Sequence, residues 1–319
     1  MRLVDNIFNS MLGAKSAPAI SAAVQDLDNT AENYNPEVMA WLNSTSWYKG
    51  NPNYITFEEA AAVTSDQFSE KPNAQKKAIV TFDEAKYFTS VTYLRNDAFY
   101  KCKLLERITI PDSVTSIGNE VFRYCSSLAL TSLPSGLTSI GISAFNGCTS
   151  LALTSLPSSI TSIGVNAFNG CTSLALTSLP NGVTSIGVNA FNGCTSLALT
   201  SPPSGITSIE SGAFNGCTSL ALTSLPSGIT SIGVNAFNGC LALKDTLYEI
   251  PSSVTEIGDK AFRNVKFPRL KFLGLTPPTF GNESIYALPQ KVDCQVPSAS
   301  LAEYQEAMKG LLYITISTY

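Results

Sequence analysis

The sequence contains no histidine among its 319 residues. Histidine is a frequent general base, the usual base of nucleophilic triads and a common zinc ligand. Its absence leaves paired carboxylates, a lysine nucleophile or an all-cysteine metal site as routes to catalysis. The composition therefore predicts a protein that is not an enzyme and has no cofactor.

Charge is also scarce, and most of it lies toward the two ends. Charged residues make up 14% of the chain, and the formal net charge is −4. Between Tyr124 and Leu243 the only charged residue is Glu210, at a position where other repeats have Gly. We interpret Glu210 as a tolerated surface change and the charged ends as solvated faces, with contact to a partner at the ends as the alternative. Since no basic run occurs, the sequence argues against binding of nucleic acid.

Long apolar runs are missing as well. No segment approaches the roughly 20 apolar residues of a membrane-spanning helix, so no membrane span is expected. The first residues also lack the apolar core of a signal peptide. They show instead an amphipathic pattern at helical spacing, formed by Leu3, Val4, Ile7, Phe8, Met11 and Leu12. This segment could pack on its own protein or dock on a partner, with residues 13–23 as a linker.

What the sequence has in abundance is one repeat of 23 residues. A Phe recurs at this spacing and reappears once more after 25 residues: Phe99, Phe122, Phe145, Phe168, Phe191, Phe214, Phe237 and Phe262. A Cys follows each of the first seven: Cys102, Cys125, Cys148, Cys171, Cys194, Cys217 and Cys240. A fixed period in this range is typical of a solenoid, in which each repeat stacks on the next.

The pattern inside one repeat is mainly that of β-structure. The pieces LALTSLP and GVTSIG have β-like spacing, whereas VNAFNGC suits only one helical or 3-10 turn. Strands stacked about 4.8 Å apart predict a rod roughly 40 Å long, in which the Phe and Cys side chains form ladders.

The Cys ladder suggests structural thiols. A zinc site needs ligands that converge on one point, whereas these cysteines form a line. Each has two equivalent neighbours, so no unique disulfide pairing follows. We predict free, buried thiols and no metal site.

The segment 102–125, CKLLERITIPDSVTSIGNEVFRYC, closely resembles the repeat of the BspA-type, or Treponema-type, leucine-rich repeat family. The resemblance covers residues 80–270 and implies a leucine-rich repeat solenoid, similar to those of gut Bacteroidales or their phages. In the middle repeats, SLALTSLP displaces one apolar residue relative to this pattern. One strand is therefore expected to be bent or bulged there.

The flanks resemble the caps of the same family. Residues 24–79 would form a helical N-terminal cap, and residues 271–319 a C-terminal cap made of a strand and a helix. Ser300 and Glu303 have the spacing of a capping box for that helix. Leu301, Tyr304 and Met308 give it one apolar side.

Residues 48–59 lie where relatives carry a calcium loop. Such a loop needs oxygen ligands at its first, third and fifth places, and this sequence has Tyr48, Gly50 and Pro52 there. We expect no calcium site.

The resemblance implies a non-enzymatic binding or adhesion protein on a bacterial cell surface, which recognises protein or glycan. Outward Ser, Thr and Asn side chains could supply many equal weak contacts. The alternative is a structural or host-recognition component of a phage virion, a tail or head decoration whose N-terminal segment contacts other virion subunits. Both readings place the protein at an extracellular surface.

Overall fold

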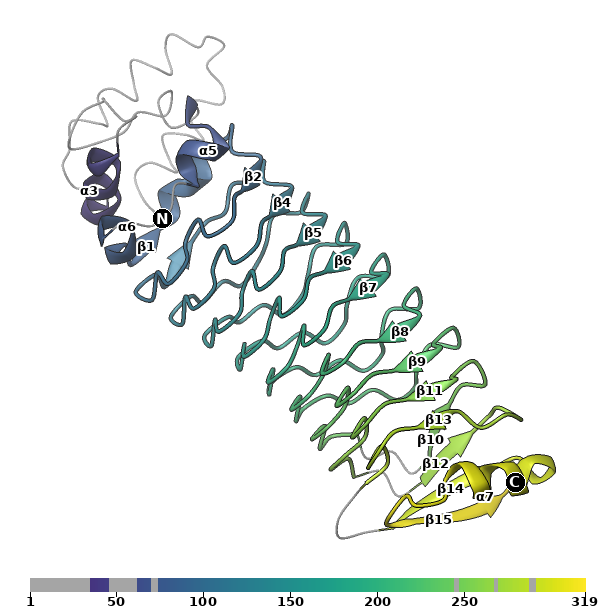
Figure 1. The fold of residues 1–319 in the computed structure, drawn as a ribbon. Coiled ribbons are helices and arrows are strands. Elements are labelled where there is room, and N and C mark those ends of the chain that lie inside the picture. Colours follow the sequence, from purple (N-terminus) through teal and green to yellow (C-terminus); the bar gives the residue numbers. More distant parts are fainter. Residues whose placement is uncertain (1–34, 46–61, 70–73, 244–246, 267–268, 287–290) are drawn as a thin grey trace.

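The computed structural model describes residues 35–45, 62–69, 74–243, 247–266, 269–286 and 291–319. They form a parallel β-solenoid of about ten turns, with a few helices at the N-terminal end and a strand–helix unit at the C-terminal end (Figure 1). The predicted fold class is confirmed. Residues 1–23 and the loop at residues 48–59 lie outside the described residues, so the docking helix and the calcium loop stay predictions.

Among the described residues, three α-helices precede the array: α3 (Pro36–Ser44), α5 (Ser65–Phe68) and α6 (Ala74–Ala78). Helix α3 begins where the Asn35 side chain accepts a hydrogen bond from Glu37 N at 3.0 Å. Helix α5 begins with a capping box, in which Thr64 and Gln67 satisfy each other's backbone N–H groups. These caps explain why α3 and α5 begin at defined residues.

A buried lysine closes the N-terminal end of the phenylalanine column. Lys76 Nζ donates to Phe68 O at 2.8 Å. It also lies 4.8 Å from the ring centroid of Trp41 and 4.4 Å from that of Phe99. The side chain is fully buried, and the Phe68 carbonyl and the aromatic faces around it are the groups that stabilise an ammonium.

One row of short parallel strands runs along the rod. Its members are β2 (Tyr93–Leu94), β4 (Ser116–Ile117), β5 (Ser139–Ile140), β6 (Ser162–Ile163), β7 (Ser185–Ile186), β8 (Ser208–Ile209), β9 (Ser231–Ile232), β11 (Glu256–Ile257) and β13 (Thr279–Phe280). Within the row, Ile pairs with Ile of the next layer, as in Ile140 with Ile163. Each Ile points inward and each Thr before the strand points outward, which gives the row one buried and one exposed face.

Within the described residues, the second row of strands is found near the two ends of the rod. It consists of β1 (Thr81–Phe82) and β3 (Arg107–Ile108) at one end, and of β10 (Tyr248–Ile250), β12 (Arg269–Phe272), β14 (Val292–Val296) and β15 (Ile314–Thr318) at the other. In the described middle repeats the LALTSLP piece forms no strand. It is joined to the preceding layer by bonds such as that from Ala175 N to Leu153 O, 3.1 Å. The strand expected in this piece is therefore wrong for the middle repeats, and the departure is larger than the bend or bulge predicted from the displaced apolar residue.

The first row is divided into two sheets between β7 and β8, in the layer that contains Glu210. At the equivalent positions of adjacent layers, an added Cβ on Gly187 or Gly233 would lie 2.6 Å from a backbone nitrogen of the layer before. Glu210 brings such a Cβ. Among the described residues, the Ile186 carbonyl lacks the bond from the next layer that Ile163 O accepts from Gly187 N at 2.9 Å. The same layer also carries Pro202 where its neighbours have Leu.

Replacing Glu210 with Gly should rejoin the two sheets. The substitution removes the obstructing Cβ, so we expect the free energy of unfolding to rise by about 1–2 kcal/mol for the restored interlayer bonds. Urea denaturation measures this. Pro202→Leu is the matched control: if it stabilises the protein and Glu210→Gly does not, the proline and not the Cβ divides the sheet.

The VNAFNGC piece turns the chain without forming a helix. Bonds between residues three apart follow one another, such as Ala190 N to Gly187 O at 3.0 Å and Cys194 N to Phe191 O at 3.0 Å. The turn requires positive φ at Asn189 (54°) and Gly193 (72°). Because Asn and Gly tolerate this conformation best, the expected helical turn is replaced by consecutive tight turns.

The C-terminal cap places α7 (Leu301–Ala307) beside the sheet of β12 and β14, and the Tyr304 hydroxyl donates to Gly274 O at 2.9 Å. Tyr304 and Met308 are buried, as expected. The predicted capping box of Ser300 and Glu303 is wrong. Ser300 ends a 3-10 turn, with φ −121° and ψ 20°, and its side chain makes no capping bond. A capping residue is normally extended, and Ser300 does not have that backbone conformation.

Candidate functional site

The eight phenylalanines of the repeat form one continuous stack inside the rod. Neighbouring ring centroids from Phe99 to Phe262 lie 5.3–5.6 Å apart and the ring planes differ by 2–12°. All eight side chains are buried. Their role is therefore to hold adjacent layers together, and none of them contacts solvent as a binding site would require.

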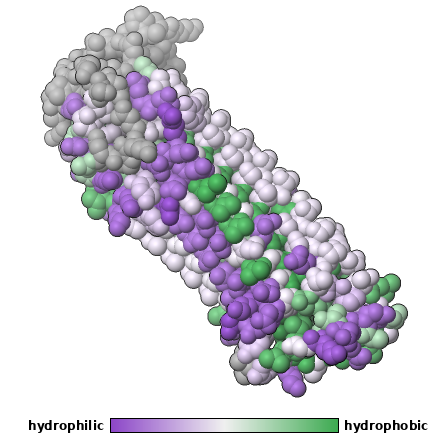
Figure 2. All heavy atoms as spheres, in the orientation of Figure 1, coloured by the Kyte–Doolittle hydropathy of each residue, from purple (hydrophilic) through white to green (hydrophobic). Residues whose placement is uncertain are grey.

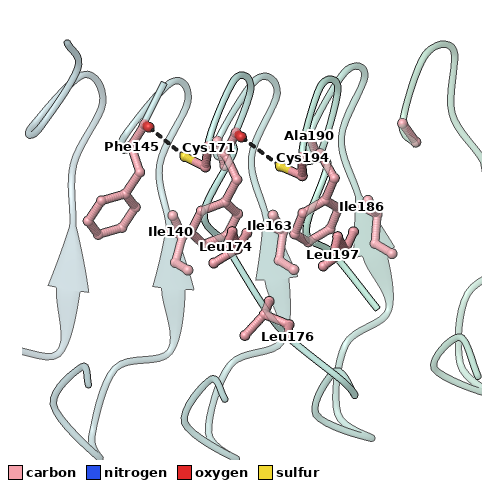
Figure 3. Packing of buried hydrophobic residues seen from close by; sticks show 14 of the residues in the cluster. Ile140, Phe145, Ile163, Cys171, Leu174, Leu176, Ile186, Ala190, Cys194 and Leu197 are labelled. Carbon is pink, nitrogen blue, oxygen red and sulfur yellow. Dashed lines mark hydrogen bonds between the residues drawn. The ribbon is translucent and has the colours of Figure 1, made fainter. Parts of the chain in front are cut away.

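The cysteines lie beside this stack, and each links two layers (Figure 3). The carbonyl of Phe168 accepts two hydrogen bonds, from Cys171 N in its own layer and from Cys194 Sγ in the next, both at 3.0 Å. The same arrangement joins Cys171 Sγ to Phe145 O at 3.0 Å. The first thiol differs, because Cys102 Sγ donates to Lys76 O at 3.8 Å. All eight cysteines of the chain, including Cys294, are free and buried.

Burial makes these thiols poor nucleophiles. Desolvation raises the pKa of Cys102 from its ordinary 9.0 to about 11 and that of Cys194 to about 12. The remaining ladder thiols shift in the same direction for the same reason. Since the thiolate is the reactive form, the ladder offers no catalytic cysteine. In the described segments, no group of three or more Cys, Asp or Glu side chains could hold a metal ion.

The outer face of the strand row carries an exposed Thr in every layer: Thr92, Thr115, Thr138, Thr161, Thr184, Thr207, Thr230, Thr255 and Thr279. Most of these hydroxyls donate to the Thr carbonyl of the preceding layer, as Thr161 Oγ1 does to Thr138 O at 3.4 Å. A second row follows the cysteines, where Thr172 Oγ1 donates to Thr149 O at 3.2 Å. Where a hydroxyl donates its hydrogen along the rod in this way, the surface presents its oxygen lone pairs and its methyl group.

The surface of the array is accordingly weakly polar and regular. Figure 2 shows pale and green positions along the rod and purple, hydrophilic residues gathered toward both ends. Exposed apolar side chains occur one layer apart at Ile142 and Val165, and again at Val234. Such a face can contact a ligand only by many similar, individually weak interactions.

Within the part of the chain that the structure describes, two of the hollows in this surface lie at the N-terminal end of the array. The larger, of about 890 Å³, lies on the strand row and is lined by residues of α5, β2, β4 and β5. Tyr93 and Arg95 belong to it, with Asp66 opposite them. The smaller, of about 220 Å³, lies beside β3 and includes the Arg107–Asp83 ion pair, 2.7 Å between Nη2 and Oδ2.

Sequence reasoning identified Arg95 and its neighbour Asp97 only as members of a charged end. It missed Asp66 and Tyr93, because they lie far from each other along the chain and outside the regular repeat. The Tyr93 hydroxyl donates to Asp66 Oδ1 at 2.7 Å, and this bond raises the pKa of the Tyr93 phenol. A departure from the repeat pattern near charged residues was the one available signal. The predicted docking residues at positions 3–12 lie outside the described residues.

Comparison with known proteins identifies the repeat. The sequence profile of the BspA type leucine rich repeat region matches residues 79–174 and 143–268, with six copies. No curated protein matches the chain. Among the described helices, none combines the length and the hydropathy that crossing a bilayer requires.

Several solved structures are similar. A Treponema pallidum leucine rich repeat protein is 38% identical over 49% of this chain and 72% of its own, with a TM-score of 0.43. A leucine rich cell surface protein of Faecalibacterium prausnitzii is 22% identical over 71% of this chain and 83% of its own, with a TM-score of 0.45. A leucine-rich repeat protein of Bacteroides ovatus is 21% identical over 72% of this chain and 82% of its own, with a TM-score of 0.32.

Proposed function

Because the chain belongs to the BspA-type leucine-rich repeat family, we propose that it is a non-enzymatic binding protein, displayed on a bacterial surface, that adheres to protein or glycan. The observation that carries this proposal is the exposed Thr row, which repeats one chemical group layer after layer. Repeated equal contacts give avidity without any single strong site.

The distribution of reactive groups supports binding and not catalysis. The thiols are buried and protonated, and the charged residues flank a central surface that contains Glu210 as its one charge. The Glu210 carboxylate accepts a hydrogen bond from Ser208 Oγ at 2.7 Å. The carboxylate is therefore paired with a residue of the strand that precedes it.

Adhesion can be measured with beads coated with the protein, on surfaces of immobilised matrix proteins and on cell monolayers. We expect retention above that of beads coated with unfolded protein. Deleting residues 150–195 removes two whole repeats and joins Thr149 to Ser196 in register. Retention should fall with the shorter array if the contacts are distributed along it. Absence of retention on every surface would refute the proposed function.

The alternative, a virion component, depends on the amphipathic pattern of residues 1–23. In that case, deleting these residues should abolish co-sedimentation of the protein with its assembly, because the apolar face is the docking surface. A control variant with Asn6 and Asn9 replaced by Ser alters only the polar face and should still co-sediment. Unchanged co-sedimentation of the deletion variant would show that residues 1–23 do not anchor the protein.

A further inference from the structure

The larger hollow, which we call the strand-face cleft, differs from the rest of the array in its chemistry. Its volume is about 890 Å³, and its lining includes two carboxylates (Asp66 and Asp97), a guanidinium, a phenol and two amides. The side chains that matter here are Asp66, Tyr93, Arg95, Asn96 and Asn119. Elsewhere along the strand row the exposed groups are mainly Ser, Thr and Val. The cleft is therefore a built feature, distinct from the repeating surface.

Helix α5 forms the wall of the cleft and is fixed to β2. Ser65 Oγ accepts hydrogen bonds from Thr92 N at 3.0 Å and Tyr93 N at 3.4 Å. Ser69 Oγ accepts from Arg95 N at 3.1 Å. These bonds place Asp66 directly beside the side chains of β2. They also occupy the backbone N–H groups at the edge of the sheet, so an incoming peptide strand could not pair there.

Asp66 holds the two long side chains of the cleft in position. Its Oδ1 accepts from the Tyr93 hydroxyl at 2.7 Å and lies 3.1 Å from Arg95 Nη1. Both interactions use Oδ1, and among the described residues no hydrogen bond reaches Oδ2 of this carboxylate. Both members of the ion pair are more than half exposed, at 57% for Arg95 and 60% for Asp66. The cleft thus presents an acceptor oxygen next to guanidinium donors.

Two glycines, Gly118 and Gly141, also line the cleft. A Cβ added to Gly141 would lie 2.5 Å from Gly118 O, so a side chain at this position would push the two layers apart. Asn96 Oδ1 accepts from Asn119 N at 2.8 Å, and Asn119 Oδ1 accepts from Ile142 N at 2.9 Å. Because these bonds fix the oxygen of each amide on the next layer, the two amide nitrogens remain as oriented donors.

We propose that the strand-face cleft binds a neutral saccharide. This inference rests on the proposed binding function and names its ligand class. Every sugar hydroxyl both donates and accepts, so adjacent hydroxyls can donate to Asp66 Oδ2 and accept from Arg95 or an Asn amide. The Tyr93 ring, 40% exposed, offers a flat face to the C–H groups of a pyranose. An anionic ligand would meet the Asp66 carboxylate, and an apolar ligand would leave the polar lining unpaired.

The test uses the full-length protein on a printed array of neutral oligosaccharides, followed by titration calorimetry with the best binder. Asp66→Asn is isosteric and keeps an oxygen for the Tyr93 bond, but it converts the free acceptor into a donor. We expect at least a tenfold loss of affinity. Asp83→Asn is the matched control, because it breaks the comparable ion pair with Arg107 outside the cleft, and its affinity should equal that of the unsubstituted protein.

The inference is overturned if no neutral oligosaccharide binds, if Asp66→Asn binds as well as the unsubstituted protein, or if Asp83→Asn loses as much. Selective binding of a basic peptide or of Ca²⁺ would also overturn it. The bead assay separates the two proposals. If the protein binds no saccharide but the beads still adhere, only the assignment of the cleft is wrong. If the beads do not adhere either, the proposed binding function is wrong as well.

Discussion

Raising the pH from 8 to 10 under reducing conditions should unfold the rod. The unfolded chain has ordinary thiols with a pKa of 9.0, whereas the native thiols keep their protons to about 11 for Cys102 and about 12 for Cys194 and Cys294. The native state therefore binds more protons than the unfolded state in this range. Stability is complete below pH 9 and falls as the pH rises toward the native pKa values.

The expected loss is large because the ladder repeats the same group. Each thiol lowers the free energy of unfolding by about 1.4 kcal/mol for every pH unit above the pKa of the unfolded chain. For eight buried thiols, the sum at pH 10 is on the order of 10 kcal/mol, which is comparable to the whole stability of a typical domain. Urea denaturation followed by circular dichroism at several pH values measures it.

Alanine substitutions isolate the thiol contribution from that of tyrosine. Replacing Cys171, Cys194 and Cys217 with Ala should reduce the slope of unfolding free energy against pH by roughly 4 kcal/mol per unit. The tyrosines remain unchanged in that variant. An unaltered slope would show that the buried thiols do not govern the alkaline transition. A thiol titration of unfolded, unreduced protein that found far fewer than eight free groups would contradict the free-thiol state itself.

Replacing Phe191 with Ala should destabilise the protein by roughly 3–5 kcal/mol, since a fully buried aromatic ring is lost and a cavity remains. Phe191 stacks on Phe168 at 5.4 Å and on Phe214 at 5.6 Å. The substitution thus interrupts the stack on both sides, in the middle of the array. Thermal and urea denaturation measure the loss.

A surface position in an adjacent layer provides the control. Val165 is 37% exposed, and Val165→Ala should change the free energy of unfolding by less than about 1 kcal/mol. A melting temperature of Phe191→Ala equal to that of the unsubstituted protein would contradict the stacked core. An equal change in the free energy of unfolding for the two substitutions would also contradict it.

The repeat predicted most of the fold because each layer repeats the packing environment of the one before. Phe recurs every 23 residues and is followed by Cys three positions later. In a stack of equal repeats, each Phe therefore packs on Phe and each Cys lies next to Cys in the adjacent layers. The solenoid follows from that pattern. The pattern also located the displaced apolar residue of the middle repeats. It could not show that consecutive tight turns, and not a helical turn, surround Asn189, since both bury the same residues.

Features that break the repeat were not predictable in this way. Glu210 was interpreted as a surface change, whereas its layer is the one at which the strand row divides. The capping box at Ser300 had the right spacing, but the 3-10 turn before it gave that residue the wrong backbone angles. In both cases the outcome depends on backbone positions of neighbouring segments.

The sequence alone determined the period, the core ladders and the scarcity of charge, because these depend on which residue types recur and how often. Only the tertiary structure brought Asp66 of α5 to within hydrogen-bonding distance of Tyr93 and close to Arg95, residues 27 and 29 positions further along the chain. That contact arises where α5 packs on the first strand of the row. Sequence spacing carries no information on such packing, since it depends on how the chain between the two elements closes.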